Sequence, residues 1–159
     1  MSPNDNWQTL VKEIAAFLTA QKNTISVAES CTAGNIATML TSLSGSSNFF
    51  EGGIIAYSEK AKINQLQVKN QDIKKYSAVS EQVAQQMVVG VKSQFQSDYA
   101  LATTGYAGPT GDKVGQVFIA FAAKEEIYVS SHLFEGARKE IVCQAAVKAL
   151  SILLSEIKK

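Results

Sequence analysis

Cysteine and histidine are scarce in this chain of 159 residues, and their scarcity excludes several classes of site. The two cysteines, Cys31 and Cys143, are too few for a disulfide framework. Neither has a second cysteine or a histidine at metal-ligand spacing, and the one histidine is His132. We therefore expect no metal site, and the sequence indicates no cofactor.

Charge of one sign is also lacking. The net charge is +1, and acidic and basic residues are interspersed without a basic block or an arginine-rich stripe. This distribution does not support nucleic acid as a partner. Of the fifteen basic residues fourteen are lysines, and Arg138 is the single arginine. A lone arginine is usually a surface residue, but its planar guanidinium also suits a phosphate or a carboxylate.

No apolar run approaches the roughly 20 residues that cross a bilayer. The N-terminal residues 1–7 are polar and lack the apolar centre of a signal peptide. We therefore expect a cytoplasmic protein with no membrane partner. The hydrophobic fraction of 46% can supply one core, so the length predicts a single domain over residues 1–159.

Apolar residues recur at helical and at strand spacing in alternating segments. A helix is expected to begin at Pro3–Asn6 and to run to about residue 21, and Ser80 is expected to cap a long helix. Further helices are predicted over 36–43, 59–67 and from about 137 onward, with a short turn at 71–76, and strands over 24–29, 52–57, 98–104, 114–123 and 126–134. Helices before, between and after the strands predict an α/β fold, a three-layer α/β/α sandwich with a mixed sheet of about five strands.

Three polar or glycine-rich segments follow predicted strands: Glu29–Gly34, Tyr57–Lys62 and Thr103–Gly111. Ligand sites in open α/β sheets lie beyond the carboxyl ends of the strands. We therefore expect any chemistry to be located in these segments.

Ser30 lies between a predicted strand and a predicted helix. Its hydroxyl could be a nucleophile, with the amides of Thr32, Ala33 and Gly34 facing an oxyanion or a phosphate. Alternatively, Ser30 or Thr32 only caps the helix, and the segment taken alone favours this reading.

A serine nucleophile needs a base, and the candidates differ in type. His132 suits the role by chemistry, but strand alternation groups it with other residues of its own strand, which favours a structural role. Lys60 and Lys62 follow a strand end, and a desolvated lysine can accept a proton. Cys31 is an alternative nucleophile, because a helix N-terminus lowers the pKa of a thiol, although packed core is the commoner role of such a cysteine.

The chain resembles the CinA C-terminal-domain family in a long series of motifs. The residues 28–34 (AESCTAG) are similar to the family signature AESCTGG. The resemblance continues, in order, through 45–47 (GSS), 52–58 (GGIIAYS), 61–62 (AK), 78–80 (AVS), 104–109 (TGYAGP) and 136–138 (GAR). It covers nearly the whole chain, from about residue 11 to residue 154.

The resemblance implies a nicotinamide-nucleotide amidohydrolase, which converts nicotinamide mononucleotide to nicotinate mononucleotide and ammonia in pyridine-nucleotide recycling. The partner implied is thus a small-molecule nucleotide substrate. Carried over position by position, the resemblance implies Ser30 as nucleophile, with Lys62 and Tyr57 assisting proton transfer. It implies Arg138 as a phosphate ligand, and it implies that the substrate pocket is completed by Cys31, Thr32, Gly34, Ser46, Thr104 and Gly105.

The chain departs from the family pattern at several places. Ala33 replaces a glycine, the second-last residue of the signature AESCTGG. The loop after Pro109 is shorter than is typical of the family. Two alternatives therefore stay open: a nucleotide-binding regulatory module of the same family without turnover, and an amidase for a different nicotinamide derivative. Many relatives carry a larger N-terminal domain, whereas we expect a stand-alone domain here. The sequence leaves the oligomeric state open, a homo-oligomer included.

Overall fold

The computed structural model describes residues 6–159; residues 1–5, on which most of the predicted first helix start falls, lie outside the described part. The elements are α1 (Trp7–Gln21), β1 (Ile25–Glu29), α2 (Asn35–Leu40), the short 3₁₀ helix η1 (Ser46–Asn48), β2 (Phe50–Ile55), α3 (Glu59–Leu66), α4 (Asn70–Tyr76), α5 (Glu81–Phe95), β3 (Tyr99–Gly105), β4 (Gln116–Ala122), β5 (Ile127–Leu133) and α6 (Arg138–Ile157). Among these helices none combines the length and the apolar character needed to cross a membrane.

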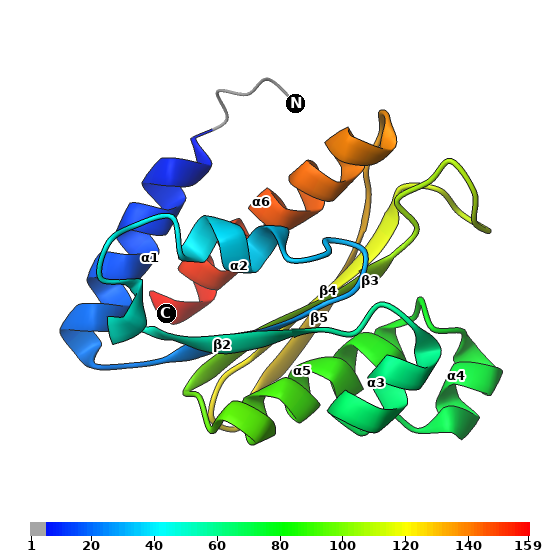
Figure 1. The fold of residues 1–159 in the computed structure, drawn as a ribbon, viewed down its shortest axis with the longest axis horizontal. Coiled ribbons are helices and arrows are strands. Elements are labelled where there is room, and N and C mark those ends of the chain that lie inside the picture. The colour runs from blue at the N-terminus through cyan, green and yellow to red at the C-terminus, as the bar shows by residue number, and fades with distance from the viewer. Residues whose placement is uncertain (1–5) are drawn as a thin grey trace.

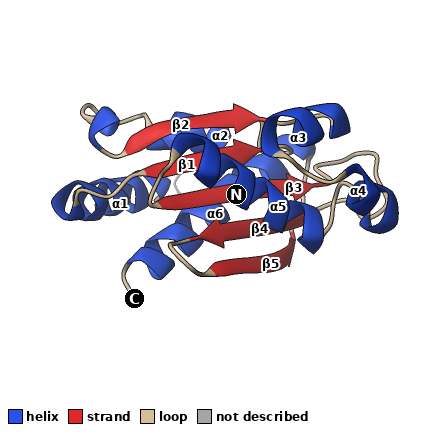
Figure 2. Ribbon diagram, turned by 90° about the horizontal axis from the view of Figure 1, so that it is seen from below, coloured by secondary structure: helices blue, strands red, loops and turns tan. Residues whose placement is uncertain are grey.

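The five strands form one mixed sheet in the order β2-β1-β3-β4-β5 (Figure 2). The pairs β1–β2 and β1–β3 are parallel, whereas β3–β4 and β4–β5 are antiparallel. The predicted mixed sheet of five strands is thus confirmed.

Helices cover both faces of this sheet, as predicted (Figure 1). Helices α1, α2 and α6 lie on one face, over a core that includes Val27, Leu101 and Ile119. Helices α3, α4 and α5 lie on the other face, against small strand side chains such as Ala100 and Ala102. The small side chains allow α5 to approach the sheet closely, and α5 contacts β1, β3 and β4.

Two expectations about local structure are revised. The segment over 52–57 was expected to be a buried strand, but β2 lies at the edge of the sheet and its residues alternate between half-buried and exposed. An edge strand has a neighbouring strand on one side only, and the apolar residues of the segment do not indicate that position. The turn expected at 71–76 is a full helix, α4. The predicted cap is confirmed, because the Ser80 hydroxyl accepts the amide of Val83 at 3.3 Å.

The order of the strands places a topological switch point at one end of the sheet. The chain leaves β1 toward α2 on one face and leaves β2 toward α3 on the opposite face. Because β1 and β2 are parallel neighbours, both exits lie at the same end, on the right in Figure 1. Such a topological switch point is the usual place of a ligand site in an open α/β sheet.

Gly90 offers a test of the packing of α5 against α3. A Cβ at Gly90 would lie 2.1 Å from the carbonyl oxygen of Leu66. Helix propensity alone favours Gly90→Ala by about 0.5–1 kcal/mol, but overpacking typically costs about 1–3 kcal/mol. We therefore expect Gly90→Ala to lower the free energy of unfolding in urea. Ser93→Ala, at an exposed position of the same helix, is the matched control and should leave it nearly unchanged; a more stable Gly90→Ala variant would contradict the close approach.

Candidate active site

Ser30 and Lys62 meet at the switch point. The Nζ of Lys62 lies 2.8 Å from the Oγ of Ser30, and it also donates to the carbonyl oxygens of Ala56 at 2.9 Å and Tyr57 at 3.3 Å. Lys62 is 2% exposed and Ser30 is 7% exposed. The amine nitrogen is thus surrounded by three oxygen atoms and screened from water, and one of those oxygens is a hydroxyl.

The local sequence explains how Lys62 reaches this position. Ser30 and Ala56 each follow the last residue of a parallel strand and extend the sheet pairing. The Ser30 amide donates to the backbone carbonyl of Thr103, and the Ala56 amide donates to the backbone carbonyl of Glu29. Ser58 then begins α3, its hydroxyl accepting the amide of Ala61 at 3.0 Å. Helical side chains point back toward the N-terminus of their helix. Lys62, in the first turn of α3, is therefore directed back at the strand ends.

Burial lowers the pKa of the Lys62 ammonium from its ordinary value of 10.5, while the charges of Cys31 and Glu59 act weakly in the opposite direction. The two ion pairs found among residues 6–159 join Lys158 to Glu13 and Lys159 to Glu156. Thus no described carboxylate pairs with Lys62 to hold its proton. Once neutral, an amine has two N–H groups and one lone pair. The two carbonyls can take the N–H groups, which leaves the lone pair for the proton of Ser30.

The turn after Ser30 is held by two buried side chains that the sequence did not single out. The carboxylate of Glu29 accepts the amides of Gly34 at 3.0 Å, Ile36 at 3.1 Å and Ala37 at 2.8 Å. Thr103 lies on the neighbouring strand β3, and its hydroxyl is 2.7 Å from the hydroxyl of Thr32. Each of these contacts ties the turn to the sheet.

These contacts correct the expectation for the oxyanion site. The amides of Ala33 and Gly34 are not free, because Ala33 donates to the Ser30 carbonyl and Gly34 to Glu29. Within the described residues, the amides of Cys31 and Thr32 have no hydrogen-bond partner. The donors available beside Ser30 are therefore those of Cys31 and Thr32. Ala33 is exposed, and its backbone φ is positive, at 48°. The glycine of the family signature adopts such an angle without strain.

Tyr57 and Arg138 meet near the end of β2 and the start of α6. The guanidinium of Arg138 donates to the Tyr57 hydroxyl at 2.6 Å and to the carbonyl of Gly108. Both side chains are exposed. The Tyr57 hydroxyl was expected to assist proton transfer, but its hydrogen-bond partner here is Arg138, and only the backbone carbonyl of Tyr57 contacts Lys62.

The remaining predicted pocket residues are distributed differently. The Thr104 hydroxyl donates to the carbonyl of Ala78 at 2.8 Å and is 1% exposed. A Cβ at Gly105 would lie 2.7 Å from the carbonyl oxygen of Gln116, so this glycine permits the close pairing of β3 and β4. Both residues thus have structural contacts at the end of β3. Thr32 is likewise fully buried, and its hydroxyl contacts that of Thr103.

Ser46 is separated from the other predicted residues. It lies in η1, before the start of β2, whereas Ser30 follows the end of β1. The two positions are at opposite ends of parallel strands, roughly 17–20 Å apart along the sheet. Within one chain, Ser46 is therefore too far from Ser30 to belong to the same site.

His132 and Lys60 do not join the pair. The imidazole of His132 bonds the Ser130 hydroxyl at 2.8 Å and stacks on Phe134, on the edge strand β5. Burial lowers its pKa, and the nearby charge of Lys148 adds to this effect. Lys60 is exposed. The structural role favoured for His132 from strand alternation agrees with these contacts.

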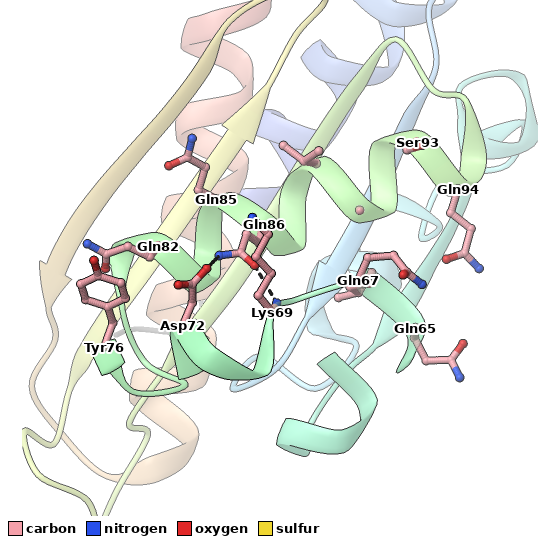
Figure 3. Close-up of a pocket in the computed structure, with 13 residues that line it drawn as sticks. Gln65, Gln67, Lys69, Asp72, Tyr76, Gln82, Gln85, Gln86, Ser93 and Gln94 are labelled. Atoms are coloured by element: carbon pink, nitrogen blue, oxygen red, sulfur yellow. Dashed lines mark hydrogen bonds between the residues drawn. The ribbon is translucent and has the colours of Figure 1, made fainter. Parts of the chain in front are cut away.

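A large groove lies elsewhere. It encloses about 720 Å³ between α3, α4 and α5, and it is lined mainly by glutamines, including Gln65, Gln82 and Gln86 (Figure 3). None of the side chains at the switch point contributes to it. The groove has the volume of a ligand site, but Ser30 and Lys62, the groups that can perform chemistry, lie at the strand ends instead. Residues 6–159 contain no cluster of three potential metal ligands.

Comparisons with known proteins agree with the motifs. The family model described as the CinA C-terminal domain matches residues 7–157. A CinA-like protein of Flavobacterium psychrophilum is 42% identical over 156 residues, which are 96% of this chain and 37% of that protein. A CinA-like protein of Nostoc punctiforme is 43% identical over 138 residues, 84% of this chain and 33% of the relative. The chain thus spans about a third of the length of these curated relatives.

Solved structures match over their full length. The competence damage-inducible protein A (ComA) of Klebsiella pneumoniae superposes with a TM-score of 0.94 at 32% identity, covering 97% of this chain and 98% of that one. The competence/damage inducible protein CihA of Agrobacterium tumefaciens gives a TM-score of 0.93 at 32% identity, covering 100% and 99%.

Thiol reactivity tests whether Cys31 is a competing nucleophile. Burial raises the pKa of the Cys31 thiol from 9.0 to about 12, and the residue is 6% exposed. Because the thiolate is the reactive form, we expect iodoacetamide at pH 8 to modify the half-buried Cys143 well before Cys31. Peptide mapping by mass spectrometry measures the two rates, and both thiols should react in guanidinium. Faster labelling of Cys31 in the folded protein would restore it as a candidate nucleophile.

Proposed function

This chain belongs to the CinA C-terminal domain family, and from this premise we propose that it is a serine amidohydrolase that deamidates nicotinamide mononucleotide. The observation that carries the proposal is the 2.8 Å contact between the buried Nζ of Lys62 and the Oγ of Ser30. A nucleophile touching a desolvated base is the arrangement that acyl transfer requires. The nucleotide substrate is the one that the family resemblance implies.

In the first half-reaction, neutral Lys62 takes the proton of Ser30 as Oγ bonds to the carboxamide carbon. The amides of Cys31 and Thr32 donate to the oxyanion that develops on the carboxamide oxygen. The Lys62 ammonium then returns the proton to the departing nitrogen, the C–N bond breaks, and ammonia leaves. The product is an ester of Ser30.

In the second half-reaction, water replaces ammonia. Lys62 accepts a proton from the water as its oxygen attacks the ester carbon, and the same two amides hold the second oxyanion. Cleavage of the ester bond returns the proton to Ser30 and releases nicotinate mononucleotide. Lys62 contacts Ser30 directly, so no relay through the Tyr57 hydroxyl is needed.

The phosphate of the substrate is assigned to Arg138. This residue is the first of the long helix α6. The first helical hydrogen bond runs from the Ile141 amide to the Ala137 carbonyl, so the amides of residues 138–140 have no backbone acceptor. A guanidinium and a helix N-terminus together favour an anion. Phosphate binding at this distance from the reaction supplies energy that orients the carboxamide.

The first test replaces the two reacting groups. Ser30→Ala should abolish ammonia release from nicotinamide mononucleotide, since loss of a nucleophile typically costs several orders of magnitude in rate. Lys62→Ala should lower kcat far more than Lys60→Ala, because the Lys60 side chain is exposed. The activity of the purified variants is measured as ammonia release, with circular dichroism to verify folding.

The pH dependence of kcat identifies the base. The pKa of Lys62 is lowered by burial, so the neutral form accumulates below pH 10.5, and the rate should rise with pH over a limb that ends below that value. This limb should persist in His132→Ala. A limb that disappears in His132→Ala but survives in Lys62→Ala overturns the serine–lysine mechanism. A folded wild-type chain that binds the nucleotide without releasing ammonia points instead to the regulatory module.

The second test concerns Arg138. Arg138→Lys should lower kcat/KM for the mononucleotide by about tenfold to a hundredfold, because an ammonium does not reproduce the bidentate guanidinium and a charge-assisted bond contributes about 1.5–3 kcal/mol. The effect on nicotinamide riboside, which lacks the phosphate, should be small. Removing the protein group and the ligand group should therefore not be additive.

Tyr57→Phe is the control for this assignment. It removes the hydroxyl that bonds Arg138 while keeping the guanidinium, so it should raise KM for the mononucleotide modestly and leave kcat nearly unchanged. Equal and slight effects of Arg138→Lys on both substrates would show that the phosphate binds elsewhere. A large loss of kcat in Tyr57→Phe would instead assign Tyr57 to proton transfer.

A further inference from the structure

Glu29 is a buried carboxylate that the catalytic steps do not use. It is 1% exposed, directly precedes the nucleophile Ser30, and forms no ion pair among the described residues. Its Oε2 accepts the amides of Gly34 and Ile36, and its Oε1 accepts the amide of Ala37. A charge removed from water is costly unless its hydrogen bonds are satisfied, and here backbone amides alone satisfy them.

We propose that Glu29 is a positioning residue that closes the N-terminus of α2 to the substrate and so directs the oxyanion to the amides of Cys31 and Thr32. The inference rests on the proposed function and adds a residue to its machinery. Its evidence is the division of the amides after Ser30: three donate to Glu29, whereas those of Cys31 and Thr32 have no partner within residues 6–159.

The geometry gives the carboxylate two effects. It fixes the turn between Ser30 and α2 from inside the protein, together with the Thr32–Thr103 contact at 2.7 Å. It also occupies the amides of Gly34, Ile36 and Ala37, which are then no longer available as donors to an anion. The substrate phosphate is thereby excluded from α2, and the two free amides stay beside the Ser30 hydroxyl.

Glu29 also leaves Lys62 without a carboxylate partner. An ion pair between them would favour the charged amine, which cannot accept a proton from Ser30. Instead, Glu29 is bound by N–H donors and Lys62 by the acceptors Ala56, Tyr57 and Ser30. The carboxyl group and the amine thus lie at the same end of the sheet, each with its own hydrogen-bond partners.

Glu29→Gln tests the inference with little change in volume. A carboxamide has one acceptor oxygen, so its NH₂ group must face at least one backbone N–H, and the turn should shift. We expect kcat to fall on the order of a hundredfold, the loss that a displacement of about 1 Å can cause, with KM for the mononucleotide changed little. A mainly structural role would lower stability without this split between kcat and KM.

Asp98→Asn is the matched control. The Asp98 carboxylate accepts the amide of Thr24 at 2.8 Å, just before the amino end of the same strand, β1. The variant makes the same change of carboxylate to carboxamide, far from Ser30, and should leave kcat unchanged even where the melting temperature falls. Equal losses of kcat in both variants would show that Glu29 acts only through stability.

A second measurement does not depend on the substrate. A fluorophosphonate reacts with an activated serine: the Oγ–P bond forms, fluoride leaves, and the serine proton passes to the base. We expect it to label Ser30 in the wild type and much more slowly in Glu29→Gln, as read by mass spectrometry. Labelling at equal rates, with equal kcat, overturns the role of Glu29 while the proposed function stands.

The remaining outcomes separate the two proposals. Labelling of Ser30 that slows in Glu29→Gln, in a wild-type chain that does not hydrolyse the mononucleotide, supports the role of Glu29 and overturns the substrate. A wild-type chain that is neither labelled nor active overturns both.

If Glu29→Gln does not fold, amide signals of the wild type decide. In a ¹⁵N–¹H spectrum, the phosphonate adduct should shift the Cys31 and Thr32 amides strongly, and those of Gly34, Ile36 and Ala37 little. The reverse pattern would show that α2, not the turn, holds the oxyanion.

Discussion

The site depends on the burial of one amine. Lys62 can act on Ser30 only if it loses its proton readily, and that requires a place without water and without a carboxylate partner. The switch point supplies both conditions, because helices leave opposite faces of the sheet and their first turns cover the ends of β1 and β2. Two backbone carbonyls then occupy the N–H groups of the amine. The rest of the site can be understood as what favours the neutral form of this amine and holds it at Ser30.

Buried groups of opposite charge usually pair, and here they do not. Glu29 and Lys62 flank the same strand end, yet each is bound by the backbone: the acid by amides at the start of α2, the base by carbonyls at the end of β2. Backbone dipoles are fixed by the fold, and their amides and carbonyls neither protonate a carboxylate nor deprotonate an ammonium. They can therefore compensate a buried charge without binding it as tightly as an opposite ion would. This division explains how one strand end can hold a base and a carboxylate at once.

Sequence patterns predicted the positions of the helices and strands better than the roles of individual residues in the site. Helical and strand periodicity predicted the layers and the mixed sheet, since each element buries one face, and motif spacing brought Ser30 and Lys62 to the same region. The partner of Tyr57 was not predictable, because Arg138 is 81 residues away along the chain. Glu29 was missed for a different reason. As the last residue of a predicted strand it gave no signal, and its function depends on which amides the turn directs inward, a property of φ and ψ and not of residue type.

The proposed function also implies a direction for the substrate, from Ser30 to Arg138. At the start of α2, Glu29 accepts backbone amides, and at the start of α6, Glu140 accepts the amide of Ala137. The start of α6 differs in also carrying the guanidinium of Arg138. Helices α2, α3 and α6 all begin at this end of the sheet, and the guanidinium at the start of α6 is the group that we assign to the phosphate. A ligand with a carboxamide at one end and a phosphate at the other can then bind in one orientation, with its neutral end at Ser30. The reversed orientation would bring a phosphate toward the Glu29 carboxylate and the desolvated Lys62 site. There the phosphate would be repelled by the acid, and it would stabilise the charged form of the base, which cannot start the reaction. Orientation and activation of the base thus follow from the same placement of Glu29.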